Sequence, residues 1–154
     1  MYRVLVLCRG NLCRSPMAAA LLDARLDRVA VASAGLDAPH GEPAADEAVA
    51  AMRARGVDIA THRATRVSAE LCRKADLILV MSRMQQREIE WRYPFARGRV
   101  FLWCEHDGRD VFDPMGESAD RFDACCALIE EGVAHWAERI GEVARLRPAM
   151  GASR

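Results

Sequence analysis

The residues best suited to chemistry are a cysteine and an arginine near the start of the chain, Cys8 and Arg14, separated by five residues. Gly10 and Asn11 lie between them, and Ser15 follows. An apolar run leads into this segment and an Ala/Leu-rich run leaves it, so the pattern predicts strand, loop and helix. Such a loop can direct backbone N–H groups and a helix N-terminus at an anion. A sulfur nucleophile at its base and the bidentate guanidinium together predict phosphoryl chemistry.

Cys8 has two interpretations, a buried structural thiol or a nucleophile. Most cysteines behave as small buried hydrophobes, which is what we expect of four others, Cys72, Cys104, Cys125 and Cys126. A thiol at a helix N-terminus beside an arginine instead ionises readily. We therefore expect Cys8 to be a thiolate at neutral pH and to attack phosphorus.

Other residues of the loop have supporting roles. Arg14 would bind two non-bridging phosphoryl oxygens, and these contacts would tighten in the transition state. Gly10 would let the backbone turn its amides inward. Asn11 tolerates left-handed backbone and would hold the shape of the loop. Ser15 is either a helix cap or a donor to the thiolate, and one hydroxyl could serve both.

Cys13 is five residues from Cys8 in the same loop. It is either a packing residue or a thiol that traps an oxidised Cys8 as a reversible disulfide. A zinc site built on this pair is not expected, because no Cys/His pair at ligand spacing accompanies it.

Cleavage of an alkoxide or phenoxide also needs an acid. Asp113, which precedes a proline, is our candidate, because Phe112 and Met115 flank it and apolar neighbours favour a protonated carboxyl. An Asp-Pro step is also a common turn starter, so a structural role stays open. Asp107 and Asp110 are the alternates.

Size and composition predict a single globular enzyme-sized domain. The chain has 154 residues, is 51% hydrophobic and has zero formal net charge. We expect one domain over residues 1–146 and a flexible tail over 147–154. Basic residues are scattered, which predicts neither nucleic-acid nor membrane binding. The six cysteines in a strand–helix pattern, with no signal peptide or long apolar run, predict free thiols and a cytoplasmic location.

Hydrophobic patterning predicts alternating strands and helices. Strands are expected at Tyr2–Leu7, Val29–Ser33, Ala75–Met81 and Arg99–Trp103. Helices are expected over Ser15–Leu26, Ala44–Arg55 (with Gly56 as its C-cap), Arg83–Arg92 and Ser118–Arg145. The last helix has an apolar stripe formed by Phe122, Cys126, Ile129, Val133, Trp136, Ile140 and Val143. This order predicts a doubly wound α/β sheet, which binds ligands beyond the carboxyl ends of its strands, where Cys8 lies.

The chain resembles the low-molecular-weight protein tyrosine phosphatases, especially their bacterial branch. The resemblance covers nearly the whole chain and is carried in family order by Cys8–Pro16, Ser33-Ala34-Gly35, His62-Arg63, Ala75–Met81 and Asp113-Pro114. It implies a single-domain, four-stranded parallel sheet with flanking helices (phosphotyrosine phosphatase I-like, flavodoxin-like) and no metal or cofactor. The implied substrate is a phosphotyrosine protein.

The resemblance also implies roles for individual residues. Cys8 would be the nucleophile, Arg14 the phosphate-binding arginine and Asp113 the general acid. The phosphate-binding loop would comprise Arg9, Gly10, Asn11, Leu12, Cys13 and Ser15. Ser33 and His62 would join the hydrogen-bond network that holds the loop and the thiolate; from its sequence context alone, His62 is a structural histidine.

One departure from the family concerns the substrate wall. Met115 stands where relatives often have a tyrosine, so Leu12, Leu36 and Met115 would form a mostly aliphatic slot. Arg9 is a bulky cation that would face acidic residues near a phosphotyrosine.

We therefore expect a phosphatase that forms a cysteinyl-phosphate, acting on a bacterial tyrosine autokinase of exopolysaccharide export. An arsenate reductase and a phosphocysteine carrier are alternatives on the same fold. The first needs a resolving cysteine pair, whereas Cys72 stands alone, and the second needs neither Arg14 nor Asp113. Related arginine phosphatases tend to carry threonine where Leu12 stands. A non-enzymatic anion-binding module is the remaining alternative.

Overall fold

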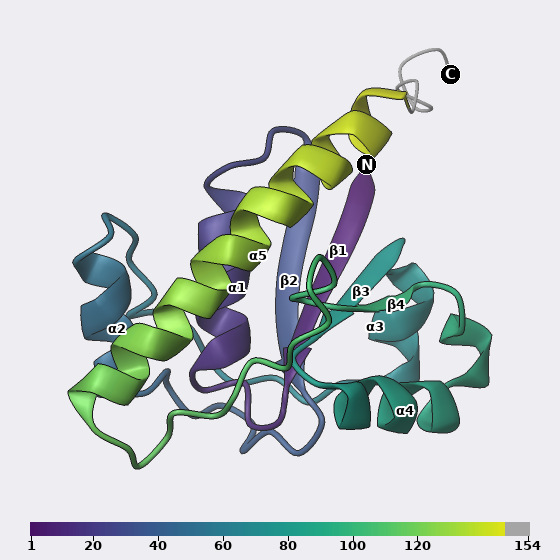
Figure 1. The fold of residues 1–154 in the computed structure, drawn as a ribbon. Coiled ribbons are helices and arrows are strands. Elements are labelled where there is room, and N and C mark those ends of the chain that lie inside the picture. The colour runs from purple at the N-terminus through teal and green to yellow at the C-terminus, as the bar shows by residue number, and fades with distance from the viewer. Residues whose placement is uncertain (147–154) are drawn as a thin grey trace.

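Four parallel strands form one sheet, in the order β2-β1-β3-β4, in the computed structural model, which describes residues 1–146 (Figure 1). The strands are β1 (Tyr2–Cys8), β2 (Val29–Gly35), β3 (Leu77–Val80) and β4 (Val100–Leu102). The helices are α1 (Arg14–Asp23), α2 (Asp46–Arg53), α3 (Ala69–Lys74), α4 (Arg83–Arg92) and α5 (Ala119–Leu146), with a 3-10 turn, η1 (Pro94–Ala96). The predicted doubly wound parallel sheet is confirmed. The predicted tail at 147–154 lies outside the described residues.

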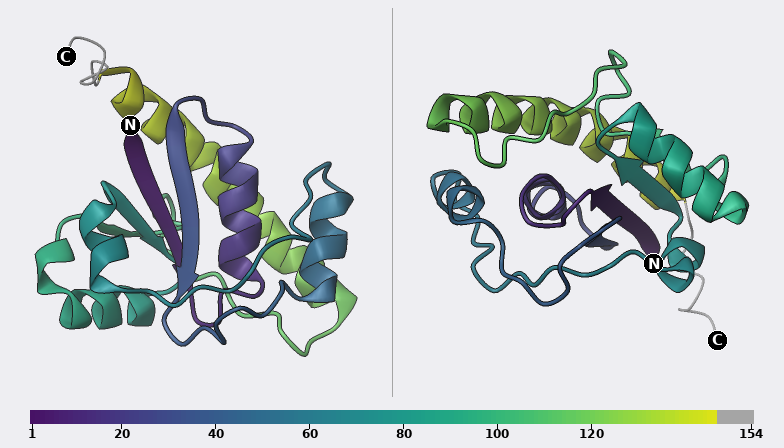
Figure 2. Two further views of the ribbon diagram at one scale, coloured as in Figure 1. Left: turned by 180° about the vertical axis from the view of Figure 1, so that it is seen from behind. Right: turned by 90° about the horizontal axis from the view of Figure 1, so that it is seen from below.

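The central strand β1 is buried on both faces. Val4 and Val6 pack in the cluster formed with α1 and α5, whereas Leu5 and Leu7 pack in the cluster formed with α3 and α4. Figure 2 shows α1, α2 and α5 on one side of the sheet and α3 and α4 on the other. Because alternate side chains of a strand point to opposite faces, a strand is apolar wherever both faces are covered, which here is from Val4 to Cys8. This strand delivers Cys8 to the carboxyl edge of the sheet.

The long helix α5 was predicted over Ser118–Arg145 and is observed over Ala119–Leu146, a difference of one residue at each end. Six of the seven stripe residues are buried: Phe122, Cys126, Ile129, Val133, Trp136 and Ile140. Val143 was expected to be inside but is 43% exposed. It lines a surface hollow with Tyr2 of β1, Leu77 of β3 and Phe101 of β4, so its side chain is only partly covered.

Two elements were absent from the prediction. Helix α3 has only six residues, too few to show a 3.6-residue period, although its N-cap Ser68 accepts a hydrogen bond from Leu71 N at 3.2 Å. The 3-10 turn η1 is three residues long. Helix α2 is also shorter than expected, ending at Arg53. Gly56 (φ +79°) closes its C-terminal end as predicted: Gly56 N donates to Arg53 O at 3.0 Å and Val57 N donates to Met52 O at 2.9 Å, the bonds of a left-handed glycine C-cap.

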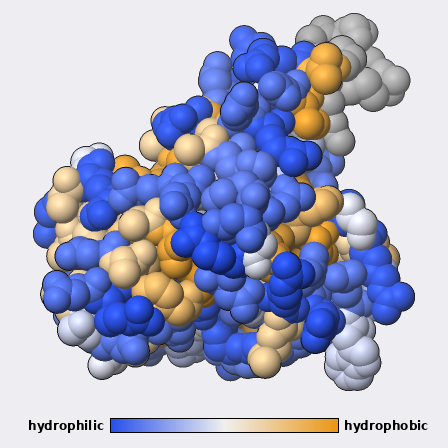
Figure 3. Space-filling model, in the orientation of Figure 1, coloured by the Kyte–Doolittle hydropathy of each residue, from blue (hydrophilic) through white to orange (hydrophobic). Residues whose placement is uncertain are grey.

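The surface over α5 is mainly hydrophilic, with hydrophobic residues exposed along both sides of the helix (Figure 3). Within residues 1–146, no helix combines the length and the apolar composition needed to cross a bilayer.

Candidate active site

Cys8 ends β1, and its sulfur has two polar neighbours. Sγ lies 3.0 Å from Ser15 Oγ and accepts a hydrogen bond from Asn11 N at 3.2 Å. Ser15 belongs to the first turn of α1, so the sulfur also faces the positive end of that helix. Each of these partners stabilises a negative sulfur more than a neutral one.

Asn11 joins the loop to two other segments of the chain. Its side chain is fully buried and donates to Ser15 Oγ (2.7 Å) and Ser33 Oγ (3.0 Å), while Oδ1 accepts from Thr65 N (2.9 Å). Its own carbonyl accepts from His62 Nε2 at 2.8 Å. The backbone of Asn11 is left-handed, with φ +55°, as expected of an asparagine at a tight turn. Ser33 and His62 therefore both hydrogen-bond to Asn11 of the loop.

The hydroxyl of Ser15 is oriented by this arrangement. Because Asn11 Nδ2 donates to Ser15 Oγ, the hydroxyl proton is available for another acceptor. The choices are Cys8 Sγ at 3.0 Å and Ala34 O at 3.4 Å, and the shorter contact is with the sulfur. Ser15 Oγ is thus placed to donate its proton to Cys8 Sγ, and α1 has no side-chain cap at Cys13.

The steric demand for glycine lies at Gly35 and not at Gly10. A Cβ added to Gly35 would lie 2.8 Å from Arg9 O and 2.9 Å from Asn11 N, which is a clash. A Cβ added to Gly10 would meet only the Leu12 side chain, at 3.7 Å. Leu36, the residue directly after β2, also contacts the start of the loop, since its N–H donates to Cys8 O at 3.0 Å.

Arg14 projects from α1 toward the loop that follows β4. It is 6% exposed, its Nη1 donates to Val111 O at 2.9 Å, and its Nη2 lies 3.8 Å from Asp113 Oδ2. The Asp113 side chain is half exposed, and its Oδ1 accepts from Met115 N at 3.0 Å. The structure therefore brings the predicted acid beside the predicted phosphate-binding arginine.

The two alternate acids are engaged elsewhere. Asp107 binds Arg109, whose backbone N–H and guanidinium hold the pKa of this carboxyl below its usual range, which makes it a poor proton donor at neutral pH. Asp110 Oδ1 accepts from Arg83 N at 3.0 Å. Neither makes a contact of this kind with Arg14, so Asp113 is the best-placed acid.

Phe112 anchors the Asp113 loop to α5. The guanidinium of Arg121 lies 3.8 Å from the centre of the Phe112 ring. The Phe112 carbonyl accepts from Cys125 Sγ at 3.7 Å. Asp113 therefore directly follows a residue whose ring and backbone carbonyl both contact α5.

The other thiols differ from Cys8 in their surroundings. Cys13 is buried, and burial holds its pKa well above the ordinary value. Burial likewise raises the pKa of Cys125 to about 12 and that of Cys72 and Cys104 to about 11. These groups stay protonated at neutral pH. The prediction that Cys72, Cys104, Cys125 and Cys126 are buried free thiols is confirmed.

The three residues of the expected substrate wall differ in exposure. Leu12 is partly buried and Met115 is 42% exposed, whereas Leu36 is 4% exposed and packs on the α4 side of the sheet. Leu36 therefore offers little surface to a substrate. Arg9 lies at the outer side of the loop, where it binds Asp37 and Glu88.

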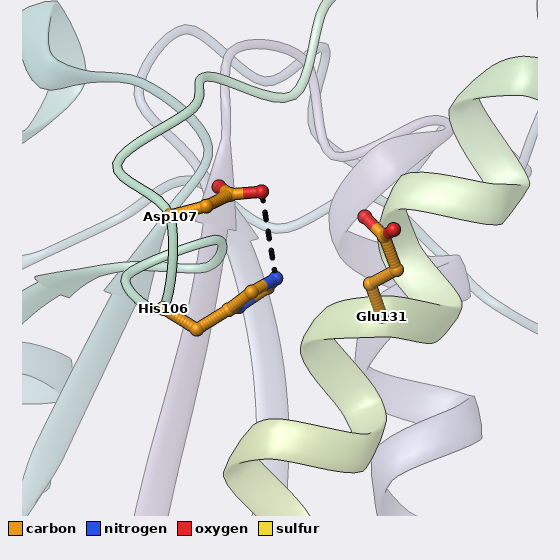
Figure 4. Close-up of side chains that lie close together, drawn as sticks. All are labelled: His106, Asp107 and Glu131. Atoms are coloured by element: carbon orange, nitrogen blue, oxygen red, sulfur yellow. Dashed lines mark ion pairs between the residues drawn. The ribbon is translucent and has the colours of Figure 1, made fainter.

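One group of side chains within residues 1–146 has the ligand types and spacing for a metal ion. His106 and Asp107 from the loop after β4, and Glu131 from α5, place their ligand atoms within 4.8 Å of one another (Figure 4). Arg109 already binds Asp107 and, at 2.6 Å, Glu131. The Arg109 guanidinium therefore supplies the positive charge between Asp107 and Glu131. Within residues 1–146, none of these three side chains forms a hydrogen bond or ion pair with the Cys8 loop.

The geometry defines a class of protein. A sulfur that contacts an amide and a hydroxyl at a helix N-terminus, in a loop that leads to an arginine paired with a carboxylate, is suited to covalent phosphoryl transfer. The model of the low molecular weight phosphotyrosine protein phosphatase family matches residues 3–146, and the chain belongs to that family.

Individual relatives agree with this assignment. A Ralstonia solanacearum protein named "Probable low molecular weight protein-tyrosine-phosphatase EpsP" is 45% identical over 89% of this chain and 94% of its own. The tyrosine phosphatase Wzb from Escherichia coli K30, in complex with sulphate, superposes with a TM-score of 0.87, 34% identity and coverage of 92% and 100%. The YwlE arginine phosphatase from Geobacillus stearothermophilus superposes with a TM-score of 0.88 and 31% identity, covering 96% of this chain and 99% of its own.

Sequence reasoning missed the residues that act through their backbone. Val111 binds Arg14 through its carbonyl, and Thr65 binds Asn11 through its N–H, so neither side chain gives a signal. Arg92, Glu88 and Asp37, which surround Arg9, were also missed. The i,i+4 spacing of Glu88 and Arg92 is the only signal in the sequence, and it is common on helix surfaces.

Proposed function

We propose that this protein hydrolyses phosphotyrosine in proteins, with Cys8 as nucleophile, Arg14 as phosphate ligand and Asp113 as general acid and base. The observation that carries the proposal is the position of Cys8 Sγ, 3.0 Å from Ser15 Oγ and 3.2 Å from Asn11 N at the start of α1. Membership of the phosphatase family supports it.

The first step transfers the phosphoryl group to sulfur. The Cys8 thiolate attacks phosphorus in line, so that the S–P bond forms as the bond to the tyrosine oxygen breaks. Asp113 gives its proton to the leaving phenolate. Arg14 and the loop amides bind the equatorial oxygens, where the charge spreads in the transition state.

The second step releases phosphate. Asp113, now ionised, takes a proton from a water molecule that attacks phosphorus. The S–P bond breaks, inorganic phosphate leaves, and the thiolate is restored with its contacts to Ser15 and Asn11. Neither step needs a metal ion or an organic cofactor to balance.

The alternatives on this fold receive less support. An arsenate reductase would use a second thiol to resolve Cys8, but Cys72 packs in the α3/α4 cluster on the opposite face of the sheet. A phosphocysteine carrier has no use for an acid beside Arg14. Leu12 disfavours phosphoarginine and suits a flat aromatic ring.

We further propose a cytoplasmic location and, as protein substrate, a bacterial tyrosine autokinase of exopolysaccharide export. The six free cysteines suit a reducing compartment. The resemblance to the bacterial branch and the similarity to Wzb support the choice of substrate.

A panel of phosphopeptides tests the reaction class. The wild type should hydrolyse phosphotyrosine peptides faster than phosphoserine, phosphothreonine or phosphoarginine peptides, and Cys8→Ser should abolish turnover of all of them. Circular dichroism checks that the variant is folded. Faster turnover of phosphoarginine would replace the proposed substrate, and normal turnover by Cys8→Ser would refute the mechanism.

A further inference from the structure

Helix α4 presents two large hydrophobic side chains to solvent. Met84 is 72% exposed and Trp91 is 79% exposed. Among the large hydrophobic residues, only Met1 and Leu146, at the ends of the described chain, are more exposed. Tryptophan is one of the residue types enriched at the hot spots of protein interfaces, the few positions that contribute most of the binding free energy.

The two residues share a face of α4 with Glu88. Positions 84, 88 and 91 are spaced by four and three residues, so their side chains lie along one stripe of the helix. The buried Gln85 and Ile89 lie on an adjacent face, roughly 100° round the helix axis from this stripe. We call these three residues, Met84, Glu88 and Trp91, the α4 stripe.

Glu88 connects this stripe to the phosphate loop. Its Oε1 lies 3.0 Å from Nη2 of Arg9, the residue that follows the candidate nucleophile. One turn further along α4, Arg92 Nη1 donates to Leu36 O at 3.0 Å, in the segment that supports the loop from β2. Figures 1 and 2 agree that α4 lies beside the carboxyl ends of the strands. The α4 stripe is therefore continuous with the rim of the candidate active site.

The charges at this rim are paired within the protein. Arg9 binds both Asp37 and Glu88, and Arg92 binds the same two carboxylates. These contacts raise the pKa of Arg9, chiefly through Glu88, and lower the pKa of Asp37. The sequence suggested that Arg9 faces acidic residues of a substrate, but its charge is already neutralised. What the stripe offers a partner is apolar surface.

We propose that Met84 and Trp91 form a docking surface for the phosphotyrosine-bearing protein, binding an apolar side chain in the segment that flanks the phosphotyrosine. The proposal rests on the proposed function, because it takes the phosphotyrosine itself to be bound at Cys8. Phosphotyrosine in the loop places the flanking polypeptide at the rim, and α4 forms one side of that rim. A rigid aromatic side chain there adds contact area at little entropic cost.

The test compares a small substrate with two phosphopeptides. The substrates are p-nitrophenyl phosphate, a phosphotyrosine peptide with leucines on both sides, and the same peptide with serines in their place. In the double variant Met84→Ser/Trp91→Ser, kcat/KM for the leucine peptide should fall about tenfold. The values for p-nitrophenyl phosphate and for the serine peptide should change less than twofold.

Two control variants separate the stripe from general effects. Leu146→Ser removes a residue that is 82% exposed at the far end of α5 and should leave all three values unchanged. Arg87→Ala removes an exposed charge next to Glu88 and should also leave the preference for leucine intact.

Three results with the double variant would overturn the docking surface: equal losses on all substrates, no loss on the leucine peptide, or conversion of a wild-type dimer to a monomer in sedimentation. A wild type that hydrolyses both phosphotyrosine peptides without preference refutes only this inference. A wild type with no phosphotyrosine turnover refutes the proposed function itself.

Discussion

The phosphate loop and the Asp113 loop supply the two halves of one reaction, yet they are built differently. Asn11 and Ser15 in the phosphate loop are fully buried and bonded to segments from β2 and from the chain near Thr65. Asp113 is half exposed, and apart from the turn to Met115 N its recorded contact is Arg14 at 3.8 Å.

The difference reflects what each loop must do. Donors that bind the transition state work best when they are already in place, since no reorganisation is then needed during the reaction. The acid must instead stand at the open side, where a tyrosine ring enters and leaves. The side chains of Asn11 and Ser15 therefore hold the first loop. The second loop is held at two residues before the acid: Val111, whose N–H donates to Met81 O at 2.7 Å and whose carbonyl accepts from Arg14, and Phe112. Changes in either loop should therefore have different consequences for catalysis and for stability.

Iodoacetate at pH 7 should alkylate Cys8 first and abolish hydrolysis of p-nitrophenyl phosphate. Burial raises the pKa of Cys13 and Cys125 well above 7, so both keep their protons and do not react. Peptide mapping by mass spectrometry identifies the modified thiol, and inorganic phosphate should slow the reaction. Inactivation with the label on Cys13 alone would contradict the distinction between these thiols.

Arg14→Lys should lower kcat/KM by about 10²–10³, because an ammonium cannot bind two phosphoryl oxygens in one plane. Thermal unfolding should change little, since lysine can still donate to Val111 O. Arg55→Lys, at another partly buried arginine, is the matched control and should retain full activity. Retained activity in Arg14→Lys would mean that the loop amides alone bind the phosphoryl group.

Asp113→Asn should slow phenyl phosphate about 10²-fold or more and p-nitrophenyl phosphate much less. A poor leaving group needs the proton, whereas nitrophenolate leaves without it. The measurement is the slope of log kcat against the acidity of the leaving phenol. The same loss for every leaving group would remove Asp113 from the role of acid.

Asn11→Ala should destabilise the fold by about 3 kcal/mol, since it removes the contacts to Ser15 Oγ, Ser33 Oγ and Thr65 N. Alanine is also strained at φ +55°. Asn11→Gly removes the same bonds without the strain, so the difference between the two variants in urea unfolding isolates the backbone contribution. Full stability in both would show that the loop holds itself together.

Arg121→Leu should lower kcat about fivefold for phenyl phosphate and hardly at all for p-nitrophenyl phosphate. The cation–π contact with Phe112 is worth about 1 kcal/mol, and its loss should loosen the acid loop without disturbing the thiolate. The rate of iodoacetate inactivation should therefore stay the same. A change in that rate would place Arg121 in the phosphate loop's support instead.

The sequence predicted the regular elements because their signals are local. The apolar run before Cys8 and the stripe along Ser118–Arg145 each depend on residues close together in the chain. The same holds for the strand–loop–helix pattern around Cys8, which predicted the phosphate loop. Short elements such as α3 were not predicted, since six residues do not complete two helical turns and show no clear period.

Local sequence patterns predicted the four strands and four of the five helices in order, the loop that carries Cys8, and the carboxyl edge where that loop lies. Tertiary structure decided which distant groups meet there. Val111 O and Thr65 N act through backbone atoms that any residue has, so no residue type marks them. The demand for glycine at Gly35 arises from atoms of Arg9 and Asn11 that lie beside it only in the folded sheet. Pairing of Arg9 with Glu88 likewise depends on how α4 packs, which local patterns do not encode.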